Sequence, residues 1–88
     1  MSLESFSEKF KRIVDSEGAI RIFKTENKEE AEKYINEAIE YYKKTFSKDV
    51  KNMTFHYFLV KQQGFVLIID NQGRTYKYNC QEKNIVFD

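Results

Sequence analysis

Apolar and aromatic side chains occupy nearly every position from residue 53 to residue 69. A strand with only one buried face alternates apolar and polar residues, because successive side chains point to opposite sides of the sheet. The run from Phe65 to Ile69 does not alternate. The pattern therefore predicts a sheet whose second face is also covered, by an N-terminal helix, a second copy of the chain or a partner.

Two other segments show the spacing of amphipathic helices. The first contains five apolar residues at intervals of three or four: Leu3, Phe6, Phe10, Ile13 and Val14. This segment predicts a short N-terminal helix that ends at about Gly18. The second helix is expected over residues 28–46, after Asn27 and Glu30, whose spacing is that of a capping box. Its apolar stripe contains seven residues: Ala31, Tyr34, Ile35, Ala38, Ile39, Tyr42 and Phe46.

Residues 19–24 alternate as a strand does, with Ile20 and Ile22 on one face and Arg21 and Phe23 on the other. From about residue 51 the period is again two, and polar turns separate strands at about 53–60, 65–69, 74–80 and 85–87. We therefore expect a single α+β domain over residues 1–88. It would consist of an N-terminal helix, a strand, the long helix and an antiparallel β-meander of three or four strands, with the long helix packed on one sheet face.

Fifteen basic and fourteen acidic residues leave a formal net charge of +1. Nucleic-acid binding usually requires a basic excess, so this balance makes a nucleic-acid-binding module the alternative rather than the first hypothesis. Its contacts would come from a basic segment and one strand: Lys43, Lys44, Lys48, Lys51, Arg74 and Lys77. The chain has no apolar run near the ~20 residues that span a bilayer and no signal-peptide pattern, so we expect a cytoplasmic protein that does not bind a membrane.

Catalysis would have to rest on the single histidine, His56, and the single cysteine, Cys80. Neither has companions at the spacing of a metal site, and the sequence contains no phosphate-binding loop or nucleophile motif. A Cys80–His56 pair would need both side chains on one face and a third group to orient the imidazole. A small hydrolase is therefore the weakest of three hypotheses, and we expect a protein that is not an enzyme, with no metal and no cofactor.

If the long helix covers the sheet face that carries Phe55 and Tyr57, the opposite face keeps an aromatic-rich surplus. We predict a partner interface there, formed by seven residues: His56, Phe58, Val60, Val66, Ile68, Tyr76 and Tyr78. Such a patch exceeds the few hundred Å² that monomers usually leave exposed. The expected function is protein binding, to another protein or in a homodimer, as a small regulator, inhibitor or accessory subunit of the kind that phages and plasmids encode.

Overall fold

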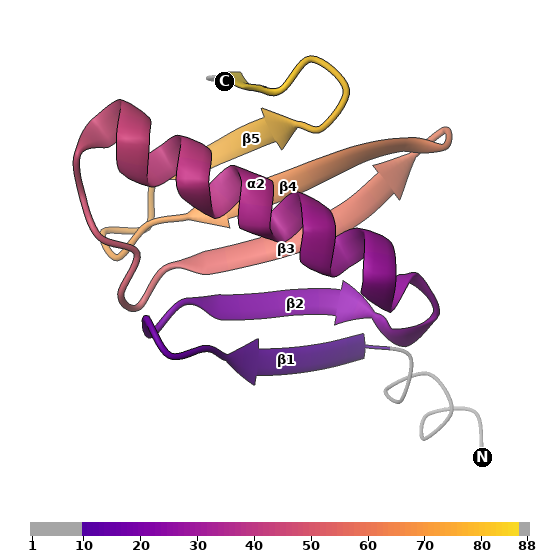
Figure 1. Ribbon diagram of the computed structural model, residues 1–88, viewed down its shortest axis with the longest axis horizontal. Helices are drawn as coiled ribbons and strands as arrows, with labels where there is room; N and C mark the ends of the chain where they lie inside the picture. Colours follow the sequence, from indigo (N-terminus) through magenta and orange to yellow (C-terminus); the bar gives the residue numbers. More distant parts are fainter. Residues whose placement is uncertain (1–9, 87–88) are drawn as a thin grey trace.

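The structure, a computed structural model, describes residues 10–86 and consists of one sheet with one long helix across it (Figure 1). The elements follow one another in this order: β1 (Phe10–Val14), β2 (Ile20–Lys24), the 3-10 turn η1 (Thr25–Asn27), α2 (Lys28–Phe46), β3 (Thr54–Val60), β4 (Gln63–Ile69), β5 (Thr75–Asn79) and β6 (Asn84–Val86). The α+β class and the long helix on one sheet face are confirmed. The sheet itself is larger than predicted, because it has six strands in the order β1 to β6 and is mixed.

The mixed character arises where β2 meets β3. These two strands are parallel, whereas all other neighbours in the sheet are antiparallel. Helix α2 lies between them in the sequence and runs diagonally over the sheet (Figure 1). Parallel neighbours cannot be joined by a tight turn, so the long helix is also the crossover that returns the chain to the same sheet.

The predicted N-terminal helix is wrong for residues 10–14, which form β1 and pair with β2. Phe10 and Val14 match a helical period, but with Arg12 they also occupy every second position of a strand. Five residues are too few to separate the two periods, and pairing with the neighbouring strand decides between them. Leu3 and Phe6, on which the predicted helix also depended, lie outside the described residues.

A tight turn joins β1 to β2. Gly18 adopts φ = 83°, a conformation that costs glycine little, and does not end a helix as predicted. The Asp15 carboxylate accepts hydrogen bonds from the backbone N–H groups of Glu17 (2.9 Å) and Ala19 (3.0 Å). The same carboxylate forms an ion pair with Arg21 (2.8 Å), which fixes the turn against β2.

Helix α2 spans the predicted residues and buries the predicted stripe. Five residues of the stripe are buried, namely Ala31, Ile35, Ala38, Ile39 and Tyr42, and the other two pack at the edge of the core. Asn27 occupies the N-cap position, but its side chain makes no capping hydrogen bond. Glu29 and Glu30 instead place negative charge in the first turn, where the helix dipole favours it. At the other end Ser47 adopts a left-handed conformation, and its N–H donates to the Lys43 carbonyl (2.9 Å).

The core lies between α2 and the sheet. Its sheet side includes Phe23, Phe55, Val66 and Ile68, none more than 1% exposed. Two tyrosines of the core form hydrogen bonds with the helix: the Tyr57 hydroxyl donates to Glu30 (3.3 Å) and the Tyr78 hydroxyl to Glu37 (3.5 Å). The helix therefore buries the central part of one face of the sheet, and it makes no contact with the other face.

Candidate functional site

Strand register divides the sheet into two faces, because paired residues on neighbouring strands point to the same side. Helix α2 covers the face that carries Phe23, Phe55 and Val66. The opposite face, here called the open face, consists of the even-numbered residues of β1, β2, β3 and β6 and the odd-numbered residues of β4 and β5. Within residues 10–86 no helix or strand covers it. An apolar face opposite the helix is thus present, as the sequence predicts.

Four rings cross the open face from β1 over β3 to β4, and we call Phe10, His56, Phe58 and Phe65 the aromatic row. Phe10 and His56 meet edge to face with ring centroids 6.1 Å apart, and His56 and Phe58 do the same at 6.1 Å. Phe58 and Phe65 are stacked at 5.7 Å across the β3–β4 pair. Aromatic pairs in such arrangements contribute about 0.5–1.5 kcal/mol beyond the area they bury. The row is therefore held in place by contacts between its own members.

A lysine lies against the ring at each end of the aromatic row. The Nζ atom of Lys24 is 5.8 Å from the centroid of Phe10, and that of Lys77 is 5.5 Å from the centroid of Phe65. With Arg12 on β1, these two lysines are the charged residues at the strand positions of the open face, and all three are basic. Within residues 10–86 none of the three forms an ion pair with a carboxylate.

Three cations away from the open face form ion pairs with carboxylates. Arg21 contacts Asp15 on the helix side of the sheet, as described above, and Lys43 contacts Glu17 at 2.9 Å and Glu40 at 3.6 Å. Lys83 contacts Glu37 at 3.1 Å. The ion pairs of the described residues therefore all lie on the helix side or in loops, and the open face keeps uncompensated positive charge.

His56 lies in the middle of the aromatic row. Burial lowers the pKa of its imidazole below the ordinary 6.5, because its surroundings disfavour the charged form. At neutral pH the ring is uncharged, so the centre of the open face is apolar while its borders are positive.

A hollow of about 290 Å³ opens at the Phe10 end of the aromatic row. Rings from three residues of the row, Phe10, His56 and Phe58, line it together with Lys24. Glu26 stands at its η1 border but forms no ion pair within residues 10–86. The hollow is thus an aromatic recess with a lysine and a glutamate at its border.

Only part of the predicted partner interface lies on the open face. His56, Phe58 and Val60 are there, as predicted. The four other residues, Val66, Ile68, Tyr76 and Tyr78, lie on the helix-covered face, so their assignment to the exposed face is wrong. The reason is the turn: Val60 pairs with Gln63, which puts Phe65, Leu67 and Ile69 on the open face. Both faces of β4 are apolar, so composition could not reveal this, and the turn residues Lys61 and Gln62 are not those that usually mark a two-residue hairpin.

The residues predicted for the nucleic-acid alternative are not brought together. Lys43 and Lys44 belong to α2, and Lys48 and Lys51 follow it in the loop to β3. Arg74 lies in the turn before β5. Lys77 alone is on the open face, separated from the others by the sheet. These six residues therefore form no single basic surface.

Cys80 and His56 lie on opposite faces of the sheet. Cys80 belongs to the core beneath α2, only 5% exposed, and burial raises the pKa of its thiol to about 11. Its neighbours there include Gly64, at which an added Cβ would lie 3.5 Å from the Cys80 Sγ. A nucleophile–base pair of Cys80 and His56 is therefore excluded by geometry.

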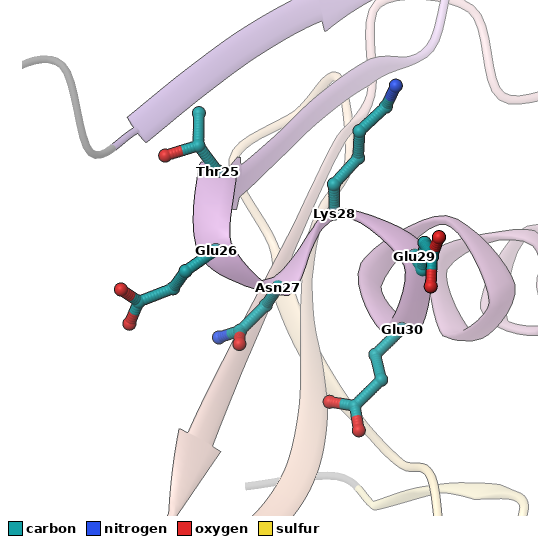
Figure 2. A pocket seen from close by; sticks show the side chains of 6 residues that line it. All are labelled: Thr25, Glu26, Asn27, Lys28, Glu29 and Glu30. Atoms are coloured by element: carbon teal, nitrogen blue, oxygen red, sulfur yellow. The ribbon is translucent and has the colours of Figure 1, made fainter.

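The start of α2 has a further hollow, of about 510 Å³, formed by η1 and the first helical turn (Figure 2). Glu26, Asn27 and Glu30 point to one side of the backbone and Lys28 to the other, so the side chains do not converge on a common point (Figure 2). Residues 10–86 contain no group of three or more His, Cys, Asp or Glu residues placed to hold a metal ion. Over the same residues, no helix has the length and apolar character needed to cross a membrane.

Comparisons of the chain with protein-family models, with curated proteins and with solved structures give no significant match. The open face is the candidate functional site, because apolar area, aromatic rings and cations without a carboxylate partner in residues 10–86 occur together there.

Proposed function

We propose that this chain is a small non-enzymatic module that binds another protein, or a second copy of itself, through the open face. It would act as a regulator, inhibitor or accessory subunit. The observation that supports this function is an apolar sheet face without a second layer in residues 10–86, opposite the face that packs on α2 and holds the core.

The open face offers enough apolar surface for specific association. Ten of its strand positions are apolar: Phe10, Val14, Ile20, Ile22, Phe58, Val60, Phe65, Leu67, Ile69 and Val86. Several remain well exposed, with Val14 at 58% and Val60 at 46%. Full burial of one such side chain contributes about 1.5–3 kcal/mol, whereas association costs roughly 4–15 kcal/mol. Burying several of them is therefore sufficient for a stable complex.

The arrangement of the rings favours protein over nucleic acid as the partner. Proteins that bind single strands stack bases on the faces of aromatic side chains. Here Phe58 and Phe65 stack on each other, and lysine ammonium groups lie over Phe10 and Phe65. These contacts already occupy ring faces, so the surface offers a partner ring edges and aliphatic side chains.

Two substitutions test this function. Phe58→Asp and Val60→Asp each place a carboxylate in the open face, and Thr45→Asp, on the exposed side of α2, adds the same charge elsewhere. Val60 is 46% exposed, so its variant should fold even if the loss of ring contacts weakens the Phe58 variant. We expect wild type and Thr45→Asp to behave alike, and both open-face variants to lose association in light scattering or partner capture from the native host.

The measurement separates the two modes of binding. A dimer that persists in high salt and dissociates in the Val60→Asp variant would support self-association, because apolar contacts respond little to ionic strength. A captured protein that Val60→Asp fails to retain would support a separate partner. If folded Val60→Asp and Phe58→Asp keep every association of the wild type, the open face is not the binding surface.

A further inference from the structure

We infer that the open face accepts an acidic amphipathic helix of a partner protein, which crosses the aromatic row over His56 and Phe58 and carries carboxylates along its two borders. This inference rests on the proposed function and specifies the partner's chemistry. It follows from three features of the face: the sign of its charges, the spacing of those charges and the recess at one end.

The sign of the charges favours an acidic partner over a second copy. Arg12, Lys24 and Lys77 are the charged residues at the strand positions of the open face, and within residues 10–86 none has a carboxylate partner. Two copies packed face to face would bring two faces of the same charge sign together, which is unfavourable. A covering layer that lacked acidic groups would also desolvate the ammonium groups without compensation. Carboxylates at the borders of the bound segment remove both costs.

The spacing of the charges fits one helix. Lys24 lies on β2 and Lys77 on β5, so the two positions are three strand intervals of about 4.8 Å apart across the strands, roughly 14 Å in that direction. An α-helix with its side chains is about 10–12 Å across. A helix over His56 and Phe58 would therefore fill the space between the two lysines and leave both ammonium groups at its borders. A bound sheet would extend over the lysines and bury them.

The recess at the Phe10 end fits one anchoring side chain. Its volume of about 290 Å³ lies just below the roughly 300–1,000 Å³ of small-molecule sites. Phe10, His56 and Phe58 line it with Lys24 and Glu26 at its border, and His56 is uncharged at neutral pH. Binding energy in protein interfaces concentrates in large side chains inserted into such recesses. We assign it to one bulky apolar or aromatic residue of the partner helix.

Synthetic peptides test the inference on the full chain. The acidic probe is an 18-residue amphipathic helix with a leucine stripe, one tryptophan and glutamates along both borders, and the basic probe has lysine in place of every glutamate. Calorimetric titration should show at least tenfold tighter binding of the acidic probe, with further weakening as salt is raised. Replacing the probe's tryptophan by alanine should weaken binding about tenfold or more.

Charge reversal on the protein provides the matched control. Lys24→Glu and Lys77→Glu should each lower the affinity for the acidic probe at least fivefold and raise the affinity for the basic probe. Lys44→Glu on α2 should change neither affinity. Equal affinity for both probes would contradict the inference that the partner is acidic, but not the proposal that the open face binds a protein. Tighter binding of a deoxythymidine 20-mer than of the acidic probe, or a dimer that excludes the probe, would also contradict the inference that the partner is an acidic helix.

Discussion

At the scale of single residues, the two faces of the sheet give polar side chains different environments. Tyr57 and Tyr78 lie under α2, and each points its hydroxyl at a glutamate of the helix. Burial and the nearby glutamates raise the pKa of both phenols to about 12, so they remain protonated hydrogen-bond donors. His56 lies on the open face among rings, and its lowered pKa has burial as its cause rather than a neighbouring charge. The tyrosine hydroxyls are thus paired with carboxylates beneath the helix, whereas burial alone keeps the imidazole on the open face uncharged.

The lowered pKa of His56 gives stability a pH dependence of definite sign. Between that pKa and 6.5 the unfolded chain binds a proton that the folded chain does not. The free energy of unfolding should therefore be highest above about pH 6.5 and fall as the pH is lowered through this value. Urea unfolding at pH 7.5 and pH 5 should show that the free energy of unfolding falls less between these pH values in His56→Phe than in the wild type. Equal losses in both proteins would mean that His56 does not titrate in this range.

Among the elements, α2 is the one whose bounds and buried side its sequence predicts best. Its stripe recurs every three or four residues over 19 positions, so the helical period is unambiguous and the buried side follows from it. β1 shows the opposite case, since Phe10 and Val14 suit a helix or a strand equally well over five residues. Local pattern therefore predicts long elements, whereas a short edge strand depends on the neighbour with which it pairs.

Substitutions on α2 test the helix–sheet contact. Ile39 is 3% exposed beneath the helix, and Asn36 is exposed on the same helix. Loss of a buried isoleucine costs roughly 2–5 kcal/mol, and a buried carboxylate without a partner adds to this cost. We expect Ile39→Asp to unfold the chain and Asn36→Asp to leave it folded, as circular dichroism and thermal unfolding would show. A native Ile39→Asp variant would contradict the observed helix face.

For the whole molecule, the sequence predicts that a second apolar face exists but not which residues form it. Phe65, Leu67 and Ile69 are as apolar as Val66 and Ile68, so only the register of the β3–β4 turn assigns them to a face. The parallel pairing of β2 with β3 was likewise absent from the predicted order, because it joins distant segments that carry no mutual sequence signal. The aromatic row depends on both, since it combines residues of β1, β3 and β4.

The parallel junction between β2 and β3 also has a consequence for the order of folding. Antiparallel neighbours from β3 to β6 are joined by short turns and close small loops, whereas Ile20 pairs with Thr54, 34 positions along the chain. The β1–β2 hairpin is too small to be stable alone. We therefore expect the chain to nucleate in β3 and β4 under α2, with the hairpin docking after the rate-limiting step.

Stopped-flow kinetics of two core variants would reveal this order. Val66→Ala, in β4, should mainly slow refolding, and Phe23→Leu, in β2, should mainly accelerate unfolding. Slower refolding of Phe23→Leu by the same proportion would place the hairpin in the nucleus instead. With late docking, Phe58 and Phe65 would already be adjacent in the transition state for folding, and Phe10 would arrive later with β1. The recess beside His56 would then be the last part of the open face to take shape during folding and the first to be lost during unfolding.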